Sequence, residues 1–289
     1  MRRAALAAAG AAAAAWIGWW EPRRLVVERV TLDLPRWPAD LDGLRAAVLT
    51  DLHGGVPYAG AEAIGRWVAC TNAERPDLVL LAGDFVDAHF LWRRRLGPEA
   101  VARELARLDA PLGVFAVLGN HDWKRGGDQV RAALEDAGVA VLENEARAAG
   151  GRLWVAGLAD MRHRLPDIPR ALAGVPAGAP AVVLAHDPDL FPLVPDRVAL
   201  TVSGHVHGGQ IAIPVLRRPA IPSRYGERYA RGHVVEHGRH LFVSSGLGTS
   251  GLPIRAFAPP EVVVLELRAG AVAGEHVLER EDAPQDRER

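Results

Sequence analysis

Five short apolar segments of this chain are each followed, directly or after one glycine, by a carboxylate, a histidine or an asparagine. The segments are residues 44–50, 78–82, 114–118, 182–185 and 199–203. Continuously apolar runs of this length are typical of β-strands that are covered on both faces. We expect further strands at 25–34, 139–142, 153–156, 241–244 and 261–267, and helices at 61–73, 98–109 and 128–138. This alternation predicts an α/β fold in which helices cover a mixed sheet system.

The polar residues after these strands form five motifs. They are Asp51-Leu52-His53, Gly83-Asp84, Gly119-Asn120-His121-Asp122, His186-Asp187 and Gly204-His205-Val206-His207. Because ligands of open α/β sheets bind at the carboxyl ends of the strands, we expect these side chains to share one rim. Oxygen and imidazole ligands together suit Mn²⁺, iron or Zn²⁺. The set offers too many ligands for one ion, and it predicts two divalent ions that share a carboxylate.

Each motif also has an ordinary structural interpretation when it is taken alone. A Gly-Asp pair at the end of a strand commonly begins a turn. A single histidine such as His186 is more often a hydrogen-bonded residue than a metal ligand. The ordered set of five motifs, each at the end of an expected strand, is what favours a metal centre.

The five motifs resemble those of the calcineurin-like metallophosphoesterase family, and the resemblance covers residues 44–267. It implies a four-layer α/β/β/α sandwich. It implies that one ion is held by Asp51, His53 and His207, and a second ion by Asn120, His186 and His205. Asp84 would bridge both ions, and His121 would be the catalytic histidine outside the ligand set.

The same resemblance implies hydrolysis of phosphodiester or pyrophosphate bonds by a hydroxide that bridges the two metals. Residues 208–211 and 246–261 further resemble a bacterial membrane-associated branch with one N-terminal hydrophobic segment. That branch implies lipid-linked or sugar-nucleotide substrates, such as UDP-2,3-diacylglucosamine-type molecules. The alternatives are a broad-specificity phosphomonoesterase, a nuclease, and a non-catalytic metal-binding scaffold.

The N-terminus predicts a membrane anchor or a cleaved signal segment over residues 1–24. Arg2 and Arg3 precede an uncharged run at 4–20. As a helix the run would extend about 26 Å at about 1.5 Å per residue, which is short for a bilayer core of roughly 30 Å. Tryptophans at its far end resemble an interfacial aromatic belt. We expect a single-pass protein of the cell membrane, with an extracytoplasmic catalytic domain favoured.

Composition excludes several classes of protein. The single cysteine, Cys70, excludes intramolecular disulfides and cysteine-based zinc clusters. The formal net charge of −1 gives no long-range attraction to nucleic acid, which is not expected as a partner.

The phosphoesterase domain is expected at 25–278, and a charged flexible tail at 279–289.

Other residues have two interpretations. Asp122 is expected to close the turn after Asn120 rather than to orient His121. Asp187 is expected to begin a helix, and Asp87 either to contact the site residues or to cap a turn. Arginines between 217 and 231 could bind phosphate or a membrane, or form an exposed face. An apolar and basic segment at 89–95 could cap the site or touch lipid.

Overall fold

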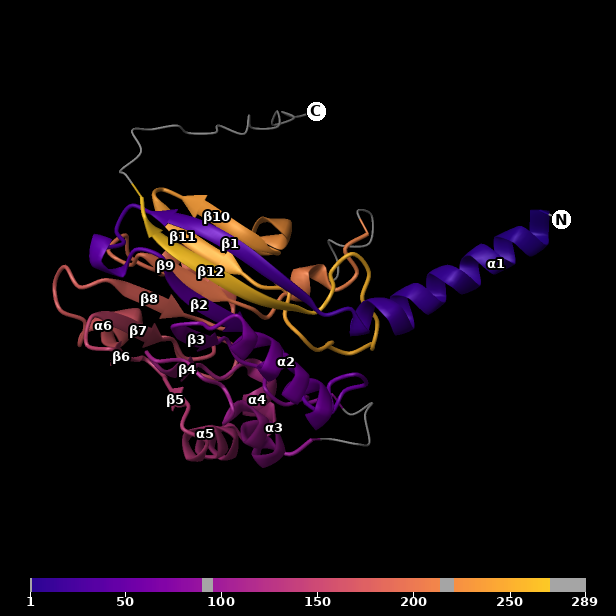
Figure 1. Ribbon diagram of the computed structural model, residues 1–289, viewed down its shortest axis with the longest axis horizontal. Coiled ribbons are helices and arrows are strands. Elements are labelled where there is room, and N and C mark those ends of the chain that lie inside the picture. The colour runs from indigo at the N-terminus through magenta and orange to yellow at the C-terminus, as the bar shows by residue number, and fades with distance from the viewer. Residues whose placement is uncertain (1, 90–95, 214–220, 271–289) are drawn as a thin grey trace, which may run out of the picture.

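The computed structural model describes residues 2–89, 96–213 and 221–270. Its centre consists of two six-stranded sheets (Figure 1). The first sheet has the order β1 (Val26–Leu34), β12 (Glu261–Ala269), β2 (Leu44–Leu49), β3 (Leu78–Leu81), β4 (Val114–Ala116) and β5 (Ala140–Val141). The second has the order β10 (Gly232–Glu236), β11 (Arg239–Val243), β9 (Leu200–Ser203), β8 (Ala181–Leu184), β7 (Leu153–Gly157) and β6 (Glu145–Ala149).

Helices cover the outer face of each sheet. The first sheet is covered by α2 (Ala61–Ala73), α3 (Pro98–Leu105) and α5 (Gly127–Asp136), and the short α4 (Asn120–Lys124) packs on α5. The second sheet is covered by α6 (Ile168–Leu172) and by the 3₁₀ helix η4 (Pro188–Leu193). Among the residues that the structure describes, the other 3₁₀ turns are η2 (Glu21–Arg23), η3 (Ala39–Leu41), η5 (His207–Gly209) and η7 (Gly226–Tyr229). The expected four-layer α/β/β/α sandwich is confirmed.

The side chains of β3 show why its sequence is continuously apolar. Leu78 and Leu80 lie in the core between the two sheets, whereas Val79 and Leu81 lie in the core beneath the helices. All four are fully buried, because successive residues of a strand point to opposite faces. Strand β2 pairs in parallel with β3, and β3 with β4, so these three strands end at the same edge.

The expected elements agree with the structure except at a few positions. The helix expected at 61–73 has those bounds, and the helix expected at 98–109 ends at Leu105. Strands β6 and β10 were not expected, because both are edge strands with half-exposed residues. Helices α4 and α6 were not expected either, since each has only five residues.

The N-terminal segment consists of α1 (Arg2–Ala15), followed by the π-helical η1 (Trp16–Trp20). Helix α1 has no buried residue and extends away from the sandwich (Figure 1). Across the described ranges, no helix combines the length and the apolar character that a membrane crossing requires. The expected tail at 279–289, most of the segment 89–95 and the arginines at 217 and 218 lie outside the described residues.

Candidate metal centre

The eight residues singled out by the motifs lie at one edge of the sandwich. They follow strands β2, β3, β4, β8 and β9, and all of them are buried, with exposed fractions between 0 and 7%. Five have a positive φ: Asp51 (53°), His53 (45°), Asp84 (56°), His205 (69°) and His207 (51°). Left-handed backbone is rare for residues other than glycine, and it concentrates at functional sites. The surrounding structure therefore holds the backbone of these five residues in a conformation that an unconstrained loop would rarely adopt.

Two glycines allow the loops to approach one another. A Cβ at Gly119 would lie 2.2 Å from Asp84 Oδ1, and a Cβ at Gly204 would lie 2.1 Å from Thr50 Oγ1. Any larger residue at either position would displace the neighbouring loop. Glycine is therefore required where the motif loops meet.

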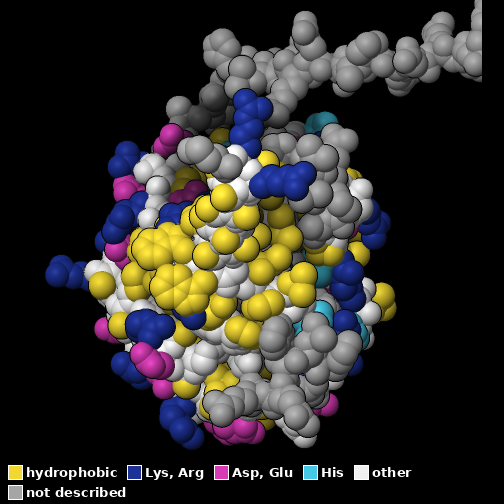
Figure 2. Space-filling model, turned by 90° about the vertical axis from the view of Figure 1, so that its right-hand side faces the viewer, with side chains coloured by type: hydrophobic (Ala, Val, Ile, Leu, Met, Phe, Trp, Pro, Cys, Tyr) yellow, Lys and Arg dark blue, Asp and Glu magenta, His cyan; other side chains and the backbone are white. Residues whose placement is uncertain are grey.

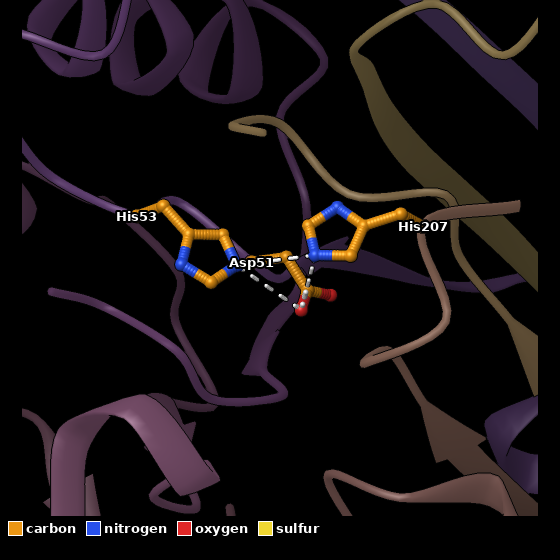
Figure 3. Close-up of side chains that lie close together, drawn as sticks. All are labelled: Asp51, His53 and His207. Carbon is orange, nitrogen blue, oxygen red and sulfur yellow. Dashed lines mark hydrogen bonds and ion pairs between the residues drawn. The ribbon is translucent and has the colours of Figure 1, made fainter. Parts of the chain in front are cut away.

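The first group of side chains consists of Asp51, His53 and His207 (Figure 3). The Nε2 atoms of the two histidines lie 3.1 Å apart, and His207 Nε2 lies 3.5 Å from Asp51 Oδ1. Asp51 Oδ2 accepts hydrogen bonds from Thr50 Oγ1 at 2.8 Å and from the His205 backbone N–H at 2.9 Å. Asp51 Oδ1 is buried and has no hydrogen-bond partner, as expected for an atom that binds a cation.

The second group consists of Asp84, Asn120, His186 and His205. The Nδ1–H of His186 donates to the carbonyl of Ala82 at 2.7 Å, which leaves Nε2 as the atom that faces the group. That Nε2 lies 3.3 Å from Asp84 Oδ2, 3.3 Å from Asn120 Oδ1 and 3.1 Å from His205 Nδ1. Four nitrogen and oxygen atoms thus converge on one point.

Asp84 belongs to both groups. Its Oδ2 lies 3.3 Å from His186 Nε2 and 3.6 Å from His53 Nε2. Carboxylate oxygens, an amide oxygen and imidazole nitrogens are ligands for first-row divalent metals. Together with the unpartnered Asp51 Oδ1, this arrangement fits a dinuclear metal centre.

The charges of the cluster also favour cations. Burial raises the pKa of Asp51 to about 6. Burial would lower the pKa of His186, but the Asp84 and Asp51 carboxylates raise it to about 10. Burial lowers the pKa of three other imidazoles well below the usual value: His53, His205 and His207. A divalent ion would supply the positive charge that His186 provides through its proton, so metal binding releases a proton.

His121 lies beside this cluster. Its Nδ1 accepts the backbone N–H of Ala88 at 3.1 Å, so in the neutral ring the proton is on Nε2. Its ring lies edge-on to the ring of His53, with centroids 4.7 Å apart. Burial lowers the pKa of His121 to about 4. A neutral imidazole with a hydrogen-bond donor therefore borders the metal groups.

The residues with two interpretations are now placed. Asp187 caps η4 by accepting the N–H of Asp189 at 3.0 Å, which confirms the expected helix start. Asp87 accepts the N–H of His89 at 3.0 Å, and its Oδ1 also lies 3.7 Å from His121 Nδ1. The described arginines of the 217–231 cluster pair with carboxylates of the chain itself: Arg224 with Asp189, Arg228 with Glu236, and Arg231 with Glu28 and Glu261.

Two positions that support the site residues were not predicted from the sequence. Thr50 orients Asp51, and Arg255 is fully buried, with its guanidinium donating to backbone carbonyls of the loop that lies against Asp51. The sequence feature that could have drawn attention to Arg255 is its position between the apolar residues Ile254 and Ala256, close to a glycine-rich stretch. A sequence pattern cannot tell that this arginine points inward.

Comparison with known proteins gives a family match, relatives of similar sequence and solved structures that align with this chain. Residues 44–209 match the family model described as calcineurin-like phosphoesterase. The chain is 31% identical to the uncharacterized metallophosphoesterase YkuE of Bacillus subtilis, covering 86% of this chain and 87% of that protein. It is 32% identical to the phosphodiesterase YaeI of Escherichia coli, covering 76% and 80%. Among solved structures, a hypothetical protein from Thermus thermophilus aligns with a TM-score of 0.45 at 18% identity, covering 74% of this chain and 88% of that one.

Proposed function

Because the chain belongs to the calcineurin-like phosphoesterase family and is a metal-dependent phosphoester hydrolase, we propose that it cleaves phosphodiester or pyrophosphate bonds. The observation that carries the proposal is the position of Asp84, whose Oδ2 lies between the two groups of nitrogen and oxygen atoms. Two ions a few ångströms apart suit a phosphoryl group, whose oxygens can contact both. The name of the relative YaeI, a phosphodiesterase, supports the choice of bond.

The proposed ligands follow the two groups and include the shared carboxylate. They are Asp51, His53, His207 and Asp84 for one ion, and Asn120, His186, His205 and Asp84 for the other. Divalent ions bound there, proposed to be Mn²⁺, iron or Zn²⁺, would supply the Lewis acidity that activates water and offsets the charge of the phosphoryl group. Asp51 and His186 are held for this role by Thr50 and by the carbonyl of Ala82, respectively.

His121 is proposed as the catalytic histidine. Because Ala88 donates to Nδ1, the neutral ring presents its Nε2–H as a hydrogen-bond donor. That N–H can donate a hydrogen bond to the oxygen of the leaving group and stabilise the negative charge that develops there as its bond to phosphorus breaks. The backbone contact from Ala88 prevents the ring from presenting the other tautomer.

The proposed substrates are phosphoesters that are lipid-linked or linked to a sugar nucleotide, and the proposed location is the cell membrane. Support comes from the segment 2–24, in which arginines precede an alanine-rich helix and tryptophans follow it. An extracytoplasmic catalytic domain is part of the same proposal. A phosphomonoesterase is the alternative within the same chemistry.

The test uses the full chain in mild detergent, stripped of metal and titrated separately with Mn²⁺, Fe²⁺ and Zn²⁺. Turnover of bis-p-nitrophenyl phosphate and of p-nitrophenyl phosphate is compared at each metal concentration. We expect metal-dependent turnover that favours the diester. Turnover that favours the monoester would support the phosphomonoesterase instead. Two bound ions without turnover of either ester, or of a pyrophosphate, would contradict the proposal.

A further inference from the structure

One face of the molecule carries exposed apolar side chains from two segments that lie far apart in the sequence. Trp19 and Trp20 of η1 are 56% and 53% exposed, and Leu252 and Phe257 are 58% and 62% exposed. Figure 2 shows a broad hydrophobic area bordered by Lys and Arg side chains on the side from which α1 extends. Most large apolar side chains of this chain are buried, so this grouping needs an explanation.

The two segments contact each other directly. The rings of Trp16 and Phe257 lie 4.9 Å apart, and the backbone N–H of Arg255 donates to the carbonyl of Ile17 at 3.0 Å. Tyr58 adds a hydrogen bond of 2.7 Å to the carbonyl of Gly18. The segments thus form one surface, which we call the apolar platform: Trp16, Trp19, Trp20, Leu252, Ile254 and Phe257.

Phe257 is held outward in an unfavourable backbone conformation. Its φ is +57°, a value that is rare and strained for a bulky residue. The neighbouring backbone fixes it, because Ala256 donates to the Gln210 carbonyl at 2.9 Å and accepts from Ala212 at 2.8 Å. The fold therefore keeps an apolar ring exposed at the expense of backbone strain.

We propose that the apolar platform docks on the headgroup layer of an anionic lipid bilayer. Tryptophan is favoured at that depth, since its ring is apolar and its N–H is polar. Arg23 lies beside the platform. Its guanidinium is 3.9 Å from the ring centre of Tyr58 and 4.8 Å from that of Trp19, and its positive charge suits lipid phosphate. Helix α1 buries no side chain, and an isolated helix of its length is marginal in water.

A second copy of the chain fits the platform less well than lipid does. The two segments that form the platform, residues 16–24 and 251–258, together contain one carboxylate. It belongs to Glu21, which is buried and paired with Arg24 at 3.0 Å. A symmetric contact between two platforms would bring Arg23 near its own copy with no exposed carboxylate from these segments to pair with it. Anionic lipid supplies the missing negative charge.

The platform is joined to the metal cluster. Gln210, three residues after His207, donates from Nε2 to the carbonyls of Ser250 and Leu252, at 3.1 Å each. Ser250 Oγ lies 3.0 Å from Nε2 of His89, whose ring lies 4.7 Å from the ring of His121. Docking would therefore place the site beside the lipid headgroups, so the substrate class would be a phosphoester carried by a lipid. This last step rests on the proposed function.

The test is flotation of the full chain with vesicles of phosphatidylcholine, with and without phosphatidylglycerol. The test variant is Leu252→Ser/Phe257→Asn, and the matched control is Leu165→Ser/Leu193→Ser, whose leucines are 82% and 67% exposed elsewhere. Asparagine tolerates positive φ, so the test variant should keep its melting temperature. We expect about tenfold weaker binding to the anionic vesicles in the test variant alone.

A second readout separates docking from chemistry. We expect the test variant to hydrolyse soluble bis-p-nitrophenyl phosphate like the unmodified chain, but to lose turnover of a phosphodiester lipid embedded in the vesicles. Equal vesicle binding by the test and control variants would overturn the docking proposal whatever the activity. Loss of a concentration-dependent dimer in sedimentation velocity, with vesicle binding unchanged, would assign the platform to a second copy of the chain.

Discussion

Asp122 accepts the backbone N–H of Asp84 at 2.8 Å, and the Asp84 carboxylate in turn accepts the backbone N–H of His121 at 2.8 Å. The loops after β3 and β4 are therefore tied together in both directions. Asp122 also accepts from the N–H groups of Phe85, Val86 and Gly119. The expectation that Asp122 closes a turn is confirmed, and the structure adds that it fixes the loop carrying Asp84.

Replacing Asp122 with asparagine should destabilise the fold and weaken metal binding. The amide group would turn two donors toward Asp84 N–H and Gly119 N–H, and each buried donor left unsatisfied costs about 1–3 kcal/mol. We expect the free energy of unfolding to fall by about 2–4 kcal/mol in urea titrations. The control, Asp136→Asn on the exposed side of α5, should change it little. Equal stability of the two variants would contradict this role of Asp122.

The shared carboxylate makes a prediction about metal content. Asp84→Ala should remove both ions, because its Oδ2 faces both groups. His207→Ala should remove the ion of its own group, and His163→Ala, an exposed control, should remove neither. Elemental analysis of the purified chains gives metal per chain. One retained ion in Asp84→Ala would mean that the carboxylate does not bridge.

His121→Ala should lower turnover while both ions stay bound. Loss of a hydrogen-bond donor to the negative charge that develops on the leaving group typically costs about 10²–10³-fold in rate. The measurement is kcat on bis-p-nitrophenyl phosphate, together with metal per chain. If the variant instead lost an ion, His121 would be a ligand and its assignment as the hydrogen-bond donor to the leaving group would be wrong.

Arg255→Met should destabilise the loop against Asp51. The guanidinium donates to the carbonyls of Ser245, Gly246, Gly248 and Ala258, and the Gly248 N–H donates to the Asp51 carbonyl at 2.7 Å. Burial lowers the pKa of Arg255 to about 10, which still leaves it charged at neutral pH. Breaking a buried charged network costs about 3–5 kcal/mol, and urea unfolding would measure this. The exposed control, Arg268→Met, should stay close to the unmodified chain.

His240 predicts a loss of stability in mild acid. Burial and the neighbouring His233 lower its pKa from 6.5 to about 4. Below pH 6.5 the unfolded chain binds a proton at His240 that the folded chain does not bind until about pH 4, so stability falls as the pH falls through this window. His240→Gln should flatten this part of the stability profile, measured by urea unfolding at several pH values. The control is His237→Gln at an exposed position, which should leave the slope of stability against pH unchanged. If His240→Gln had a slope as steep as that of His237→Gln, the assignment to His240 would be wrong.

Local sequence predicted those elements whose residues carry their own signal. The helix Ala61–Ala73 has the apolar spacing of a helix that packs on a sheet, and β3 is apolar on both faces. Strand β6 (Glu145–Ala149) carries no such signal, because it lies at the edge of its sheet and four of its five residues are exposed or half-buried. This segment becomes a strand because it pairs with β7, and the sequence of its five residues does not show that pairing.

The sequence by itself determined which residues gather at the metal centre, since each follows a strand and parallel strands end at one edge. Only the tertiary structure decided which atoms face one another: the Oδ2 of Asp84 between His53 and His186, and the inward guanidinium of Arg255. It also decided that Trp16 meets Phe257 on one surface. The physical reason is that strand and helix patterns arise from neighbours along the chain, whereas these contacts depend on how two packed sheets bring distant loops together.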